Sequence, residues 1–82
     1  MEKINQNNLD YKVIKIARAI FSKKNIDINT NSSISEWDSL NHLRLMTEFQ
    51  KNFKIKFELN EIININSLNK WSRLIKKKLN KK

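Results

Sequence analysis

The sequence contains no cysteine, no glycine and no proline among its 82 residues. Without cysteine, the chain cannot form a disulfide framework or a cysteine-based zinc site. Without glycine and proline, its turns must be made by Asn, Asp and Ser, of which Asn tolerates the left-handed conformation best. No apolar run approaches the roughly 20 residues that a membrane-spanning helix needs.

The length of the chain is that of one domain, and it is sufficient to bury a hydrophobic core. We therefore expect residues 1–82 to form a single domain, with an ordered core over about residues 8–79 and frayed ends. The first ten residues, MEKINQNNLD, lack the apolar stretch of a secretory signal. The expectation is a soluble, cytoplasmic monomer.

The net charge of +9 is concentrated at one end of the sequence. Residues 66–82 contain seven basic residues and no acidic residue, whereas residues 1–65 contain ten basic and eight acidic residues. The basic excess is therefore a property of the C-terminal segment, and the remainder of the chain is nearly neutral.

Apolar residues at helical spacing predict four helices and no sheet. The first helix is expected to begin at an Asn7 or Asn8 cap, to run through Phe21, and to be followed by a left-handed Asn25. A long loop over residues 26–37 precedes a second helix from about Asp38 to Asn52. Residues 54–59 are expected to be an extended loop that leads to a short third helix near residues 60–64. Asn66 or Ser67 caps the last helix, which carries Leu68, Trp71, Leu74, Ile75 and Leu79 on one side.

The most informative segment is Trp37-Asp38-Ser39-Leu40, where the long loop meets the second helix. Asp38 is a suitable N-cap, and a serine at a helix start projects its hydroxyl away from the helix end. A phosphodiester at this point would lie near unpaired N–H groups, which stabilises it by about 0.3–1 kcal/mol. The alternative is that Asp38 and Ser39 act only as a cap.

With this motif, the chain resembles the acyl carrier protein family, in which Asp-Ser-Leu opens the second of four helices. The resemblance continues through Glu48, Phe49 and Phe53 and through the segment 65–68, Ile-Asn-Ser-Leu, and it extends from the first helix to Leu79. It implies an all-α four-helix bundle of acyl-carrier-protein type, with a short third helix and a long loop between the first two helices. The apolar residues expected to line the core and any cargo cavity include Leu43, Met46, Phe49, Ile62 and Ile63.

The resemblance implies that Ser39 is the attachment point for 4′-phosphopantetheine, which a phosphopantetheinyl transferase supplies from coenzyme A. Asp38 is the adjacent N-cap. The thiol of the arm would carry an acyl, aminoacyl or related group as a thioester between a loading enzyme and a downstream transferase or synthase. His42 is the single histidine and is expected to pack against its neighbours. The chain therefore lacks the groups that metal or nucleophilic catalysis requires, and we expect no enzymatic activity.

The predicted partner-binding face lies on the second helix. Family members are typically acidic on this helix, whereas here Arg44, Gln50, Lys51 and Asn52 stand where acids are common. Residues 36–65 contain five acidic and four basic residues, so we expect partners of weak or mixed charge and a specialised biosynthetic pathway. The face comprises Leu40, Asn41, Arg44, Thr47 and Lys51.

Two other functions are compatible with the basic C-terminus. The first is a small basic helical module that binds nucleic acid, although no recognition helix with base-reading side chains is apparent. The second is attachment to a membrane surface through the apolar side of the last helix. If Leu68, Trp71 and Ile75 close the core of the domain, they cannot also enter lipid.

Overall fold

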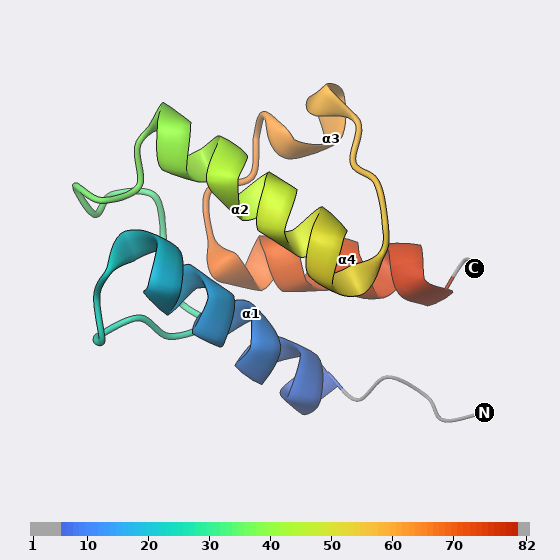
Figure 1. Cartoon of the computed structure of the whole chain (residues 1–82), viewed down its shortest axis with the longest axis horizontal. Helices are drawn as coiled ribbons and strands as arrows, with labels where there is room; N and C mark the ends of the chain where they lie inside the picture. Colours follow the sequence, from blue (N-terminus) through green and yellow to red (C-terminus); the bar gives the residue numbers. More distant parts are fainter. Residues whose placement is uncertain (1–5, 81–82) are drawn as a thin grey trace.

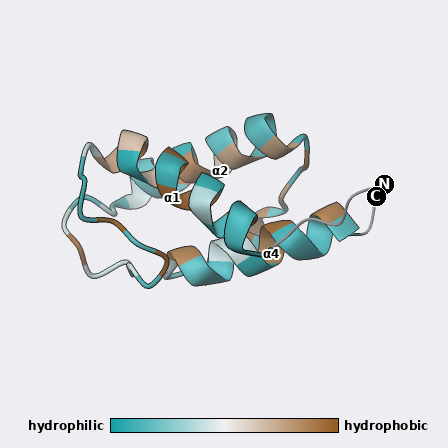
Figure 2. Ribbon diagram, turned by 90° about the horizontal axis from the view of Figure 1, so that it is seen from below, coloured by the Kyte–Doolittle hydropathy of each residue, from teal (hydrophilic) through white to brown (hydrophobic). Residues whose placement is uncertain are grey.

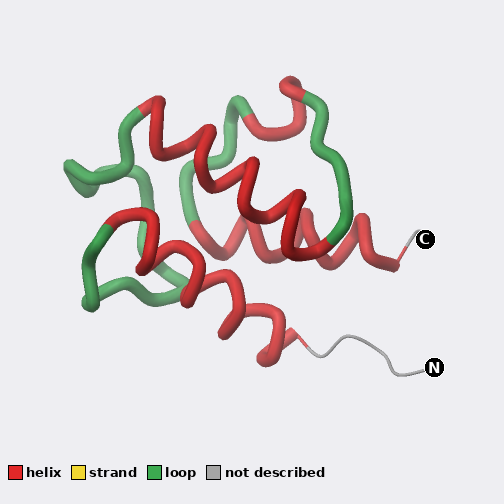
Figure 3. The backbone as a smooth tube through the Cα atoms, viewed as in Figure 1, coloured by secondary structure: helices red, strands yellow, loops and turns green. Residues whose placement is uncertain are grey.

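Four helices are present in the computed structural model, which describes residues 6–80. They are α1 (Gln6–Phe21), α2 (Ser39–Phe53), α3 (Leu59–Ile62) and α4 (Leu68–Asn80). Helices α1, α2 and α4 pack against one another, and the short α3 lies within the connection from α2 to α4, with a loop on each side of it (Figures 1 and 3). The prediction of four helices, the third of them short, is confirmed. The expected fraying concerns residues 1–5 and 81–82, which lie outside the described residues.

The core forms where the apolar sides of the three long helices meet. Each helix alternates hydrophobic and hydrophilic residues around its axis (Figure 2), and the apolar positions predicted for α4 are buried or half-buried. Trp71 is fully buried, and its ring contacts His42, Phe49 and Phe57 with centroid separations of 5.2–5.3 Å. Aromatic pairs at such distances contribute about 0.5–1.5 kcal/mol beyond the area that they bury.

The long loop between α1 and α2 is held to the rest of the molecule at several points. Ile26 and Trp37 are buried in the core. Midway along the loop, the Ser32 N–H donates to the Asn66 carbonyl at 2.8 Å, and the Leu68 N–H donates to the Thr30 carbonyl at 3.0 Å. The loop is therefore fixed to the start of α4, which keeps its last residues in place at the start of α2.

The left-handed residues are not the asparagines that the sequence suggested. Ser22 (φ 53°) follows α1, and Lys54 (φ 56°) follows α2, so the prediction for Asn25 was wrong. In both places, the next N–H returns to a carbonyl of the last turn: Lys23 donates to Arg18, and Ile55 donates to Gln50, each at 3.2 Å. These bonds satisfy carbonyls that would otherwise lack a donor. The start of α1 also differs, because Asn7 and Asn8 lie inside the helix that begins at Gln6.

A buried polar cluster joins the first and last helices. The Ser72 hydroxyl, on a residue that is only 1% exposed, donates to the Asp10 carboxylate. The Gln6 amide donates to Asp10 at 2.8 Å and to the Ser72 oxygen at 2.7 Å. The three side chains thus satisfy one another where α1 packs on α4.

Replacing Ser72 with alanine should lower the free energy of unfolding by about 1–3 kcal/mol, because Asp10 and Gln6 lose a partner in a partly buried place. Urea unfolding followed by circular dichroism measures the change. Ser32→Ala is a control at an exposed serine whose hydrogen bond to Asn66 is made by the backbone N–H and not by the hydroxyl. If Ser72→Ala left the unfolding midpoint unchanged, the cluster would not stabilise the α1–α4 contact.

Candidate functional site

Hydrogen bonds among residues 36–42 fix the backbone at the start of α2. Asp38 is the N-cap: its carboxylate accepts from the Asn41 N–H at 2.8 Å, and its carbonyl accepts from the His42 N–H at 2.9 Å. The Asn41 amide donates back to the Glu36 carbonyl at 2.7 Å. Residues 36–42 therefore form a closed hydrogen-bonded unit, and Ser39 is the first helical residue within it.

The Ser39 side chain is exposed to solvent. Within residues 6–80, its hydroxyl has no hydrogen-bond partner, and the backbone N–H groups of Ser39 and Leu40 have no acceptor. An accessible hydroxyl beside free N–H groups at the positive end of a helix dipole suits a group that carries a phosphate. The local structure does not need this hydroxyl for its own stability.

An apolar cleft of about 460 Å³ begins at Ser39 and runs between the start of α2 and the α3 region. Five large hydrophobic residues are exposed in the described chain: Leu40 directly follows Ser39; Leu43, Leu59 and Ile63 line this cleft; and the fifth, Tyr11, is on α1. Solvent-exposed apolar side chains are thus concentrated around one hydroxyl, which is typical of a binding surface. Leu59 was not identified from the sequence, although its spacing of four residues from Ile63 places both on one side of a short helix.

Two residues predicted to be in the core are instead on this surface. Leu43 is 46% exposed and Ile63 is 73% exposed, whereas Phe49 and Ile62 are buried and Met46 is half-buried. The expectation that Leu43 and Ile63 lie in the core was therefore wrong, whereas both residues do line a cleft. Helix α3 ends at Ile62 after a single turn, so no further helix turn carries Ile63 inward.

His42 forms one wall of the cleft and connects its two sides. The Trp37 indole N–H donates to His42 Nδ1 at 2.9 Å, and His42 Nε2 lies 2.9 Å from the Ile62 carbonyl oxygen. Because an indole nitrogen can only donate, Nδ1 is the acceptor, and Nε2 carries the proton that it donates to Ile62. His42 therefore ties the loop before Ser39 to α3, in agreement with the packing role predicted for it. Trp37 both anchors the loop and lines the cleft.

Comparison with solved structures identifies the fold. The chain is similar to the solution NMR structure of a holo acyl carrier protein from Geobacter metallireducens, with a TM-score of 0.79 and 32% sequence identity. The match covers 89% of this chain and 86% of the other. This chain belongs to the acyl carrier protein family. A scan against protein-family models gives no match, and no curated protein sequence matches the chain.

As a member of the acyl carrier protein family, the chain has a carrier role. The residues predicted for its partner-binding face are in different situations. Leu40, Arg44, Thr47 and Lys51 are exposed, whereas Asn41 is half-buried and holds the Glu36 carbonyl. Leu40, Arg44 and Thr47 also line a second groove, between α1 and α2.

Helix α3, which forms the far wall of the cleft in this carrier, is held by Glu61. The Glu61 carboxylate accepts from the Glu58 N–H at 2.8 Å and pairs with Lys78 of α4 at 2.8 Å. The Glu58 N–H and then Lys78 lower the pKa of Glu61 below its ordinary value of 4.5. Glu36, two residues before Asp38 in the loop that leads to α2, also has a lowered pKa, mainly because its carboxylate accepts from its own backbone N–H.

The lowered pKa of Glu61 makes the stability that it contributes dependent on pH. A carboxyl with a lower pKa in the folded state stabilises the fold above its unfolded pKa, and this contribution is lost as pH falls through the folded pKa. Glu61→Gln can keep the cap but loses the ion pair, so it should reduce stability at neutral pH by about 0.5 kcal/mol. The difference from wild type should be smaller at an acidic pH, where the Glu61 carboxylate is protonated, than at neutral pH. Chemical denaturation at both pH values, with Glu48→Gln as the unpaired-carboxylate control, measures the effect; an equal difference at both would contradict it.

Proposed function

We propose that Ser39 carries 4′-phosphopantetheine and that the chain presents an acyl, aminoacyl or related group, as a thioester, to partner enzymes. The observation that supports this most directly is the exposed Ser39 hydroxyl, which is free of hydrogen bonds within residues 6–80 and stands at the start of α2 beside an apolar cleft. The related solved protein is described as a holo acyl carrier protein.

The residues around Ser39 fit this group. The free N–H groups of Ser39 and Leu40 suit a phosphate, and the apolar cleft that starts at Ser39 suits the uncharged part of an arm. When bound, the group supplies a thiol on a flexible tether, which can hold cargo as a thioester. Asp38 remains engaged with Asn41 and keeps the backbone around Ser39 in place.

Loading requires a transferase and coenzyme A. The Ser39 oxygen forms a bond to the phosphorus that bears pantetheine, and the bond from this phosphorus to the 3′,5′-ADP portion of coenzyme A breaks. The hydroxyl proton passes to a base on the transferase. Because Ser39 is exposed on a rigid helix start, the transferase can reach it without unfolding the loop.

The carrier acts by presentation. A tethered cargo has a high effective concentration at whichever enzyme binds the carrier, and the length of the tether limits how far it can reach. The apolar side chains exposed around Ser39 would then contact the partner or the cargo.

Intact-mass spectrometry tests the proposal. The purified chain, incubated with coenzyme A, magnesium and a broad-specificity phosphopantetheinyl transferase, should gain the mass of one phosphopantetheine group. If a well-folded sample gained no mass while a known carrier was loaded in the same mixture, the proposed function would be wrong.

We further propose that the carrier serves a specialised pathway. Basic and amide residues occupy α2 positions where many family members have acids, so enzymes that recognise acidic carriers should bind it weakly. In a reconstituted fatty-acid synthase, the loaded chain should support much less product than an acidic carrier.

The basic side of α4 does not favour the alternative functions. Leu68, Trp71 and Ile75 are buried in the core, so they are not available to enter a membrane. Within residues 6–80, no helix is long and apolar enough to cross a bilayer. Lys70, Arg73 and Lys77 are exposed on a helix whose other side closes the core, which is typical of a solvated helix face.

A further inference from the structure

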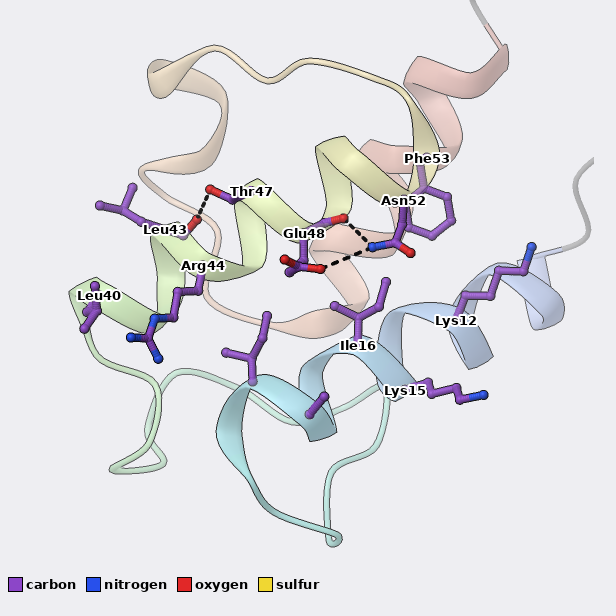
Figure 4. Close-up of a pocket in the computed structure, with 12 residues that line it drawn as sticks. Lys12, Lys15, Ile16, Leu40, Leu43, Arg44, Thr47, Glu48, Asn52 and Phe53 are labelled. Carbon is purple, nitrogen blue, oxygen red and sulfur yellow. Dashed lines mark hydrogen bonds between the residues drawn. The ribbon is translucent and has the colours of Figure 1, made fainter.

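A second concave surface adjoins the cleft at Ser39, because Leu43 lines both. It is a groove of about 970 Å³ between α1 and α2, and it ends at Leu40, the residue after Ser39. Figure 4 shows Ile16 pointing from α1 toward α2, with Leu40 near the start and Phe53 at the end of α2. Leu43 also belongs to the lining. Apolar residues therefore make up half of the twelve that line the groove, and the groove adjoins the proposed attachment site.

The rim of this groove is positively charged. Lys12 and Lys15 project from α1, and Arg44 from α2 extends into the space between the helices (Figure 4). None of the three has an ion pair within residues 6–80. Three uncompensated cations around an apolar groove create a positive potential that attracts acidic groups.

The single acid in the groove does not neutralise these cations. Glu48 is one helical turn beyond Arg44, but its carboxylate faces the Asn52 amide, which is 3.5 Å away and also donates to the Glu48 carbonyl at 2.8 Å. An Arg44–Glu48 pair at this spacing would be favourable on a helix surface, yet it is not formed. Arg44 thus remains available to a partner.

We propose that the groove between α1 and α2 binds an acidic amphipathic helix of an enzyme that this carrier serves. The apolar side of such a helix would lie on Ile16 and Leu43, and its carboxylates would pair with Lys12, Lys15 and Arg44. This inference rests on the proposed carrier function and names the chemistry of the partner. The proposed interface extends beyond α2 to α1. The near-neutral charge counted over residues 36–65 does not apply to it, because α1 lies outside that range.

Other ligands of a basic surface fit the groove less well. A bilayer is flat and cannot follow a concave surface between two helices. Nucleic acid requires cations for its phosphates and aromatic faces for its bases, but the lining of this groove has one aromatic ring, the half-buried Phe53. An acidic amphipathic helix matches both features of the groove. Its apolar side fits between α1 and α2, and its carboxylates pair with the cations at the rim.

Two synthetic peptides of about 18 residues, long enough to form a helix, test the proposal. They share one stripe of leucines and differ only in their flanking residues, which are glutamate in one and lysine in the other. Titrated into the isotope-labelled protein, the glutamate peptide should shift the NMR signals of Ile16, Leu43 and Arg44. Its affinity should exceed that of the lysine peptide by about tenfold or more and should fall as salt is raised.

Paired charge reversals locate the site. Lys15→Glu with Arg44→Glu should reverse the preference, so that the lysine peptide binds better. Lys70→Glu with Arg73→Glu makes the same change of charge on the exposed side of α4 and should retain the preference for glutamate. Equal effects of the two double variants, or peptide shifts that map to α4, would overturn the proposal.

The remaining arms separate this proposal from its alternatives and from the carrier function. Binding of anionic lipid vesicles or duplex DNA that is lost in the groove variant, with no binding of the glutamate peptide, would overturn the proposed protein partner. Intact mass of the same samples reports loading of Ser39 independently. A chain that binds the peptide but is never loaded keeps the groove and refutes the carrier function, whereas a loaded chain that binds neither peptide refutes the groove alone.

Discussion

Ser39→Ala is expected to abolish loading with phosphopantetheine while leaving the fold intact. The hydroxyl is the proposed attacking group, and alanine has no oxygen to form the phosphodiester. The substitution removes no hydrogen bond within residues 6–80, and the N-cap bond from Asn41 to Asp38 does not involve Ser39. Mass spectrometry should therefore show complete loss of the modification, with an unfolding midpoint close to that of wild type.

The matched control is Ser35→Ala, at an exposed serine in the loop that precedes α2, four residues before Ser39. It should be loaded as fast as wild type. Loading of Ser39→Ala would show that another residue accepts the group. Equal failure of both variants would indicate that the transferase recognises the loop, and peptide mapping of modified wild type would then identify the true attachment residue.

Trp71→Ala should have the largest effect on stability. Trp71 is completely buried and contacts rings from α2 and from the segment after it, so its removal leaves a large cavity at the centre of the core. Truncation of such an aromatic residue typically lowers the free energy of unfolding by about 3–5 kcal/mol. Small domains have about 0.05–0.15 kcal/mol of stability per residue, so the variant should be mostly unfolded or close to it.

Trp71→Phe provides the comparison. The Trp71 indole nitrogen is buried without a hydrogen-bond acceptor in the described part of the chain, so phenylalanine sacrifices no hydrogen bond and removes an unsatisfied donor. Its loss should be about 1–2 kcal/mol, well below that of alanine. Urea denaturation measures both variants. Equal losses would mean that the indole N–H contributes an interaction that the structure does not contain.

The periodicity of the sequence predicted the long helices because each has one side that must be buried. Leu9, Val13 and Ala17 repeat at helical spacing in α1, and all three are buried. The resemblance that begins at Asp38 and Ser39 correctly indicated the family. A capping residue is a local feature, so its geometry follows from the residue type and its neighbours.

Helix ends and surface apolar residues were less predictable. The helices before Ser22 and Lys54 end where their apolar sides end, and the chain reverses there through a left-handed residue. Because the sequence has no glycine, a serine and a lysine adopt this conformation. Leu43 was assigned to the core because its position in α2 is on the apolar side. Its exposure depends on where the neighbouring helices α1 and α3 end. The periodicity of residues within α2 carries no information about those ends.

The residue pattern alone determined that this chain forms helices, which side of each helix is buried, and that α2 begins with Asp38 as cap and Ser39 beside it. These properties depend on neighbours within a few turns. Only the tertiary structure decided that His42 joins Trp37 to Ile62, that Leu59 and Ile63 meet beside Ser39, and that α1 adds Lys12 and Lys15 to the groove of α2. Those arrangements depend on how the helices pack across long separations in the sequence, and this packing is set by the whole core at once.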